Sequence, residues 1–367
     1  MKIKYFNLIF WIGSLFYCFM IISYYKTTQD FLLDNILSLD FKSYLFYKSS
    51  NNLEWTFFND NDHYDYLNNI KGFFENTIDP NSIFNNLLRN DITISYFIYL
   101  LSPSFENRLV VILIFNFTTL LILYYLNYKL LKLFNIKKNL LSAVLPILIF
   151  SYYVPQINKE LFTILFLFTS IFFLKKPSLK IFLVLIFISL FRIQFALALA
   201  PMLFFIFCRN LKMFYIILFT FIYFTICVYL LSSTGLVSYN NLYFAILFDL
   251  EKDFFNTILF YFFNIIKVIF IFFNFQLIYD RISDKIFVNI LYLIIFFHVV
   301  LIIFVNFKYL ITKSLYLNSD KRILLFIIFF FFCIVSASGV TSQRYVFNIY
   351  PLLLLFFNNN KKLLLNK

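Results

Sequence analysis

The sequence contains little charge and very little glycine. Only 13% of its 367 residues are Asp, Glu, Lys or Arg, whereas 62% are hydrophobic, and the mean hydropathy is +0.84. Soluble globular domains are about 25% charged, so this composition excludes an ordinary soluble domain. The chain has only 4 glycines. That scarcity counts against a rocking transporter, because the broken helices and close crossings of such proteins usually use glycine.

Motifs for several common chemistries are also missing. The sequence has no phosphate-binding Walker loop, no G-x-S-x-G elbow and no dinucleotide fingerprint. Neither His63 nor His298 has a His or Cys partner at ligand spacing, so we expect no zinc site. Packing, rather than disulfide formation or metal ligation, is the expected role of the four cysteines, which lie within or at the ends of apolar runs (Cys18, Cys208, Cys227 and Cys333).

What the sequence does contain is a series of apolar runs of about 20 residues, each long enough to cross a bilayer as a helix. The sequence therefore predicts an all-α, polytopic integral membrane protein. We expect about 10–12 transmembrane helices, some of them short re-entrant or broken hairpins. Residues 1–367 should form a single membrane domain. The first run, at residues 5–25, lacks a small-residue cleavage site and is expected to be a retained helix.

Residues 26–108 are expected to form a large first external loop with interfacial helices. This segment holds 11 of the 18 acidic residues of the chain. Residues 30–48 carry an apolar stripe typical of an interfacial amphipathic helix. Residues 92–102 are apolar but too short to span a bilayer, so they predict a re-entrant or interfacial helix that ends at Ser102-Pro103.

The formal net charge of +13 is interpreted as membrane topology rather than as nucleic-acid binding, because the excess lysines fall in short loops. The positive-inside rule places alternate loops in the cytoplasm. Cytoplasmic loops are expected after the runs 109–128, 161–174 and 195–208, and before the run 323–337. The C-terminal tail is also expected in the cytoplasm. The other expected runs are 139–155, 178–191, 213–231, 258–279, 286–307 and 345–357, with 236–250 as the segment that would complete twelve crossings. We expect a multi-pass protein of the bacterial inner (plasma) membrane with both termini cytoplasmic.

The strongest polar clusters all fall on the predicted external side. The first contains Asp60, Asp62 and Asp65. One of these carboxylates is a candidate general base toward a hydroxyl, or two of them a site for a divalent cation. The alternative is helix capping, with Asp62 at the N-cap and Asp65 in the first turn of a helix that buries Tyr66 and Leu67.

The later clusters are mainly cationic. Lys159 and Arg192 occupy external turns, where cations are disfavoured, so they are candidates for binding an anion such as a lipid-linked phosphate. The alternative is an ion pair of Glu160 with Arg192 or Lys159 that joins two hairpins. Arg344 is a candidate second phosphate ligand, or else a lone interfacial arginine. The candidate substrate-binding residues are Lys159, Glu160, Arg192, Gln194, Gln343 and Arg344.

The order of these pieces resembles the GT-C superfamily of polytopic glycosyltransferases. The resemblance rests on an Asp-x-x-Tyr-like element around Asp62 and Asp65-Tyr66, an Asn-Lys-Glu at Lys159, and a late Arg344-Tyr followed by Pro351. It implies a catalytic acidic residue in the first loop and a carrier phosphate held by the basic turns. The sequence is also similar to O-antigen and capsule repeat-unit polymerases. It lacks their usual acidic pair directly after the first helix and their large late external loop.

The expected function is therefore membrane glycosyl transfer from a polyprenyl-phosphate-linked sugar to a glycan acceptor during cell-surface polysaccharide synthesis. Repeat-unit polymerisation is an alternative within this chemistry. A transporter or flippase of lipid-linked sugars is an alternative of another class. The expected partners are the lipid donor, the glycan acceptor and the bilayer, without nucleic acid. The only cofactor considered is a divalent cation at the aspartates.

Overall fold

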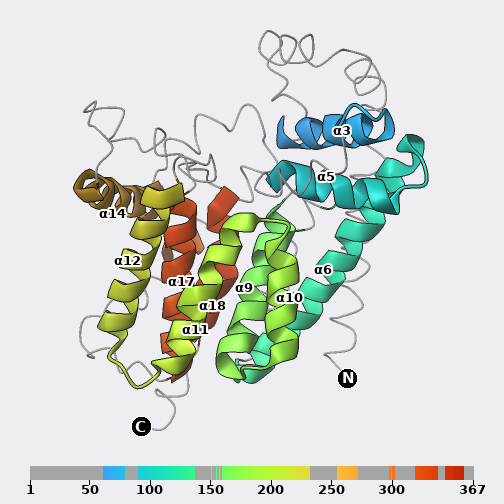
Figure 1. Ribbon diagram of the computed structural model, residues 1–367. Helices are drawn as coiled ribbons and strands as arrows, with labels where there is room; N and C mark the ends of the chain where they lie inside the picture. The colour runs from blue at the N-terminus through green and yellow to red at the C-terminus, as the bar shows by residue number, and fades with distance from the viewer. Residues whose placement is uncertain are drawn as a thin grey trace, which may run out of the picture.

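The computed structural model is all-helical in the part of the chain that it describes (Figure 1). The described residues are 61–78, 90–136, 150, 154, 157, 159–231, 254–271, 297–298, 300–301, 319–337 and 344–358. Two of the described helices are long and apolar enough to cross a membrane by length and composition, over Val110–Leu133 and Met213–Leu230. The predicted all-α class is confirmed, and the polytopic arrangement remains a prediction.

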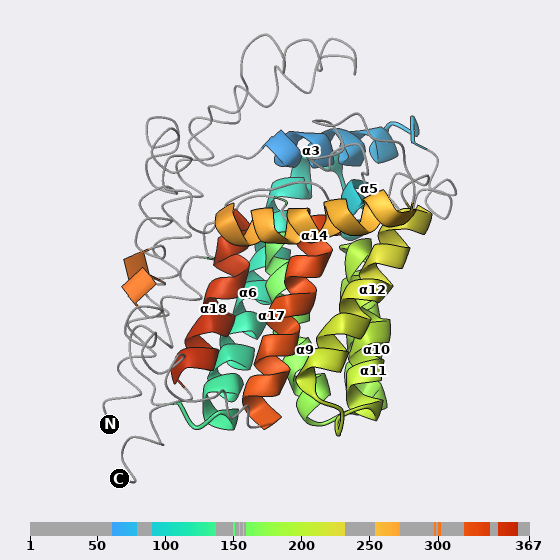
Figure 2. The same ribbon diagram turned by 90° about the vertical axis from the view of Figure 1, so that its left-hand side faces the viewer.

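Most of the described helices stand lengthwise in one bundle (Figures 1 and 2). They are α6 (Arg108–Leu133), α9 (Glu160–Lys175), α10 (Leu179–Ser189), α11 (Leu199–Phe207), α12 (Met213–Leu231), α17 (Ser319–Ala337) and α18 (Arg344–Asn358). The 3-10 helix η5 (Ile193–Ala198) joins α10 to α11. Each of these helices coincides with an apolar run expected from the sequence, although α6 extends further than expected.

The central helix of the bundle is α9, which contacts α6, α10, α11, α17 and α18. Nearly all of its side chains are buried. Aromatic rings attach the α10–η5–α11 hairpin to it. The ring centroids of Phe162 and Phe191 are 4.4 Å apart, and those of Phe166 and Phe195 are 4.6 Å apart. Such stacked pairs contribute about 0.5–1.5 kcal/mol each beyond the burial of their area.

One end of the bundle, called here the basic end, collects cationic side chains from several helices. These residues are Lys132, Lys175, Lys176, Lys180, Arg209, Lys212, Lys321 and Arg322. Three contacts join the helix ends there. Lys175 pairs with Asp320, Arg209 donates to the carbonyl of Leu174, and Arg322 donates to the carbonyl of Leu211 at 2.5 Å. These contacts bring the C-terminal ends of α9 and α11 next to the N-terminal ends of α12 and α17, which agrees with the directions that the lysine pattern predicts for these four helices.

Two shorter helices, α3 (Asn61–Phe74) and α5 (Asn90–Leu101), lie across the opposite end of the bundle (Figures 1 and 2). They pack on each other through buried side chains such as Tyr66, Ile70 and Ile94. The helix α3 ends in a Schellman motif. Asn76 adopts φ 55°, and the amide of Thr77 donates to the carbonyl of Gly72 at 2.9 Å. The prediction of a short, non-spanning helix at residues 92–102 agrees with α5.

The prediction that residues 258–279 cross the bilayer is wrong for its described part. Helix α14 (Phe254–Ile271) lies crosswise over the ends of α12 and α17 (Figure 2). Its inner face is polar enough to cap α17, since the Tyr261 hydroxyl donates to the Cys333 carbonyl at 2.8 Å and the Asn264 amide to the Ser336 carbonyl at 2.5 Å. The last four carbonyls of a helix lack an intrahelical donor, so the Asn264 amide supplies a missing bond at Ser336, whereas the Tyr261 hydroxyl adds a second bond to the Cys333 carbonyl.

Several predicted segments lie outside the described residues. They are the first helix at 5–25, the stripe at 30–48, most of the runs 139–155 and 286–307, and the segment 236–250. The helix count, the position of both termini and the extent of the 26–108 loop therefore remain predictions.

Candidate functional site

The end of the bundle beneath α3 holds a buried polar cluster formed by three helical elements. Glu160 is the first residue of α9, Arg192 is the turn residue between α10 and η5, and Asn348 lies one turn into α18. Arg192 is extended, with φ −151° and ψ 86°, so the turn breaks the helix and directs the next segment back toward the basic end. We call Glu160, Arg192, Thr163 and Asn348 the polar cluster.

Glu160 and Arg192 form a buried ion pair. The Arg192 Nη1 atom lies 3.7 Å from Glu160 Oε1, and the two side chains are only 8% and 3% exposed. The sequence left open whether these residues bind an anion or form an ion pair between two hairpins, and the structure shows the ion pair. Because desolvation of two charges is expensive, such a pair persists only when further hydrogen bonds satisfy the remaining polar atoms.

Those further bonds are present on both partners. Arg192 Nη1 also donates to the Thr163 hydroxyl at 2.7 Å, and that hydroxyl donates to the Lys159 carbonyl at 3.0 Å. The Asn348 amide nitrogen donates to Glu160 Oε2. Asn348 is fully buried, and its amide oxygen has no hydrogen-bond partner among the described residues. The cluster therefore ends in an acceptor that a hydroxyl or amide group can satisfy.

Lys159 connects this cluster to α3. It is the N-cap residue of α9, and its ammonium lies 5.4 Å from the ring centre of Tyr66. A cation at a helix N-terminus opposes the helix dipole, so it adds positive potential where the amide groups already carry it. Asp62 is one turn before Tyr66 in α3. Residues four positions apart occupy neighbouring positions along one side of a helix, so the backbone position of Asp62 lies one turn from that of Tyr66, toward the start of α3.

The other candidate residues from the sequence are described by the structure to different extents. Asp62 and Asp65 lie in α3 and Arg344 begins α18, but only their backbone positions are described. Asp60 and Gln343 lie outside the described residues. Since α3 begins at Asn61, Asp62 falls inside its first turn rather than at the N-cap, within the usual uncertainty of one or two residues.

Gln194 is half-buried in η5, two residues beyond Arg192. No group of three or more His, Cys, Asp or Glu side chains with metal-binding geometry is found among the described residues. The proposed divalent cation at the aspartates is therefore untested, because the side chains of Asp62 and Asp65 fall outside that search.

Sequence reasoning missed Thr163 as a member of the site. Its spacing gave a usable signal, since Thr163 is three positions after Glu160 and four after Lys159 and so shares their helix face. Asn348 is the member of the polar cluster that comes from α18. Its bond to Glu160 joins residues 188 positions apart, which no local pattern encodes.

The chain matches no protein-family model, no curated protein and no solved structure.

Proposed function

We propose that this chain is a polytopic membrane glycosyltransferase that uses a polyprenyl-phosphate-linked sugar donor. The membrane location is supported by large apolar side chains that remain exposed along whole helices. On α12 the exposed residues recur every four positions, at Phe214, Leu218, Ile222, Ile226 and Leu230. The 19 residues of α12 span about 28 Å at 1.5 Å per residue, close to a hydrocarbon core of about 30 Å. Exposed apolar stripes of this length mark contact with lipid or protein.

The chemistry is supported by one observation: a buried, hydrogen-bonded arginine and a helix N-terminus meet beneath α3, at the end of the bundle opposite the basic end. The N-terminus of α9, together with Lys159 and Arg192, favours an anion such as the donor phosphate. In the proposed reaction an α3 carboxylate takes the proton of the acceptor hydroxyl. The acceptor oxygen then bonds to the anomeric carbon, and the bond from that carbon to the phosphate oxygen breaks.

Asp62 is the best candidate for the general base among Asp60, Asp62 and Asp65. It shares a face of α3 with Tyr66, which contacts Lys159, whereas Asp65 is on another side of the helix. Glu160 has a different role in this proposal. Its pairing with Arg192 and Asn348 positions the guanidinium, and does not leave the carboxylate available as a base.

The test is glycan synthesis in membranes that carry Asp60→Asn, Asp62→Asn or Asp65→Asn separately. We expect Asp62→Asn to reduce synthesis at least about a hundredfold, in the range typical for loss of a general base. Glu75→Gln, which alters an exposed carboxylate at the other end of α3, is the matched control and should leave synthesis unchanged. If all three aspartate variants retain full synthesis, the general-base assignment is wrong.

The same membranes distinguish transfer from transport. An inactive transferase should accumulate its lipid-linked donor on the external face, where a membrane-impermeant glycan probe detects it. An inactive flippase should leave that donor on the cytoplasmic face. Repeat-unit polymerisation differs from single transfer in its product, because its loss leaves single repeat units on the acceptor in place of long chains.

A further inference from the structure

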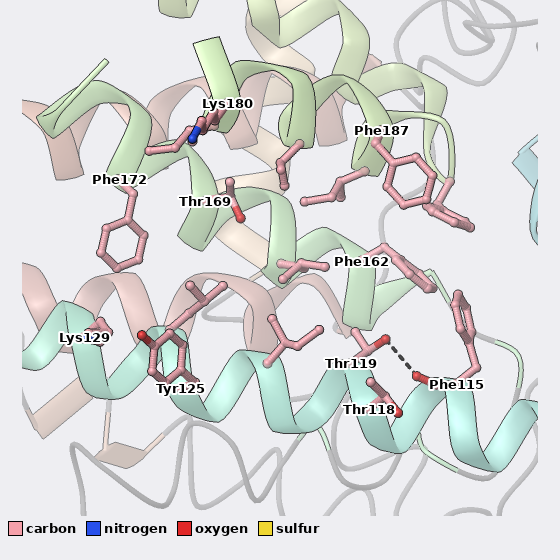
Figure 3. Close-up of a pocket in the computed structure, with 17 residues that line it drawn as sticks. Phe115, Thr118, Thr119, Tyr125, Lys129, Phe162, Thr169, Phe172, Lys180 and Phe187 are labelled. Atoms are coloured by element: carbon pink, nitrogen blue, oxygen red, sulfur yellow. Dashed lines mark hydrogen bonds between the residues drawn. The ribbon is translucent and has the colours of Figure 1, made fainter. Parts of the chain in front are cut away.

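A long groove runs along the side of the bundle between α6 and α10, with α9 as its floor (Figure 3). Its volume is about 660 Å³. Along α6 it extends from Phe115 to Lys129, a distance of about 21 Å at 1.5 Å per residue. That length exceeds half of a hydrocarbon core of about 30 Å. The groove is thus long enough to hold an extended hydrocarbon chain.

The wall of the groove is apolar between its two ends. It includes Ile122 and Leu126 from α6 and Val184 and Phe187 from α10. Three threonines also line it, Thr118 and Thr119 from α6 and Thr169 from α9. The hydroxyls of Thr118 and Thr119 donate to the carbonyls of Ile114 and Phe115, at 2.7 and 2.9 Å. These hydroxyls are already bonded within α6. A polar ligand would gain little there, whereas a hydrocarbon chain complements the wall.

The two ends of the groove differ in charge. Lys129 from α6 and Lys180 from α10 flank one end, whereas Phe115, Phe162 and Phe187 close the other (Figure 3). No acidic residue is among the lining residues. The Lys129 ammonium lies 5.1 Å from the ring centre of Tyr125, a cation–π contact that holds it beside the groove. The charged end is continuous with the basic end of the bundle.

We infer that this groove binds an anionic membrane lipid, with one hydrocarbon chain between α6 and α10 and the headgroup phosphate at Lys129 and Lys180. An anionic lipid complements this groove, because the charged side chains among its described lining residues are two lysines at one end. The inference rests on the membrane location proposed above but not on glycosyl transfer. The headgroup sits at the basic end, whereas the donor phosphate is assigned to Arg192 at the opposite end.

The test is photo-crosslinking of the full chain in phosphatidylcholine vesicles that contain a trace of photoreactive phosphatidylglycerol or photoreactive phosphatidylcholine. One lysine near an anionic lipid surface favours binding about fivefold, so Lys129→Gln with Lys180→Gln should lower phosphatidylglycerol cross-linking about 30-fold. The matched control is Lys132→Gln with Lys176→Gln, which removes two exposed cations of the basic end that do not line the groove. It should lower cross-linking less than twofold.

A second pair of variants tests the chain position. Val184→Trp fills the groove from a half-exposed site, whereas Leu183→Trp adds the same ring at the neighbouring exposed position outside it. We expect only Val184→Trp to abolish cross-linking within the groove. Both positions are exposed, so neither change disturbs the core.

Three results would overturn the inference. Equal cross-linking of both lipids, or a loss with Val184→Trp but not with the lysine variants, would exclude an anionic headgroup at this end. A disulfide between the Val184→Cys variant and Cys18 of the chain's own segment 5–25 would show that protein, not lipid, fills the groove. Activity of the Asp62→Asn variant is independent of these outcomes, so failure of this inference leaves the proposed function standing.

Discussion

At the scale of single residues, the central feature is a carboxylate and a guanidinium removed from solvent together. Glu160 is held by Arg192 and Asn348, and Arg192 by Glu160 and Thr163. This arrangement fixes the position of the guanidinium before any ligand arrives. An anion site built in this way loses little entropy on binding, because its side chains are already ordered.

The buried pair should show strong energetic coupling. Arg192→Met leaves the Glu160 carboxylate buried without its charge partner, and Glu160→Gln does the same to the guanidinium, so each should lower the free energy of unfolding by about 3–5 kcal/mol. The double variant should be more stable than the sum of the two losses predicts, by about 0.5–3 kcal/mol. Denaturant unfolding of the purified chain in detergent measures all three.

The exposed pair of Lys71 and Glu75 supplies the control for this cycle. Its atoms are 3.6 Å apart, close to the separation in the buried pair, but its side chains are 22% and 53% exposed. Lys71→Met with Glu75→Gln should couple by no more than about 0.5 kcal/mol. Equal coupling in the two cycles would contradict the role of burial.

At the scale of elements, α14 is the helix whose placement matters most. Its outward face carries Phe254, Phe255, Leu259, Phe262 and Phe263, all exposed, whereas Tyr261 and Asn264 face α17. Burial raises the pKa of the Tyr261 hydroxyl well above its usual value, so it remains a donor to the Cys333 carbonyl. An aromatic face on a crosswise helix is typical of a helix that lies in the membrane interface.

Nitroxide labels should report this placement as a depth. We replace Phe255 or Phe262 by cysteine in a background without the 4 native cysteines, and use Ile222 of α12 as the comparison. Both α14 labels should be shallow, because the helix lies across the end of the bundle, whereas the Ile222 label should be near the bilayer centre. Power-saturation EPR with polar and apolar relaxants measures the depth. A depth that increases steadily along α14 would restore a crossing helix.

At the scale of the whole molecule, charge divides the bundle into two ends. Cations from six helices or their flanking turns gather at the basic end, and the polar cluster with α3 lies at the other. In the membrane location that we propose, lysine-rich loops remain in the cytoplasm, so the polar cluster is expected toward the external face. The separation agrees with a site that meets external glycan while a lipid supplies the sugar.

Labelling of intact cells should show on which side of the membrane each end of the bundle lies. A membrane-impermeant maleimide should modify Glu75→Cys, in the turn after α3, without lysis. Lys176→Cys, at the end of α9, should react only after the membrane is opened, because the basic end is expected in the cytoplasm. Both positions are exposed, so differences in burial do not explain the result. Reaction of both cysteines in intact cells would contradict the predicted topology.

Much of the helical framework could be predicted because its signals are local. Apolar runs located α9, α12 and α18 to within one residue at each end. The same signal failed for α14. Average hydrophobicity does not separate a crossing helix from an amphipathic one, and α14 has a bonded polar face that appears only with its partner α17 in place.

The sequence by itself determined where the helices lie and in which direction each bundle helix runs, because hydrophobic length and loop charge are properties of neighbouring residues. Only the tertiary structure decided that Glu160 pairs with Arg192, and that Thr163 and Asn348 complete the cluster. It also decided that α14 lies crosswise. These contacts join residues distant in the chain, and their energies depend on burial, which exists only once the helices have packed.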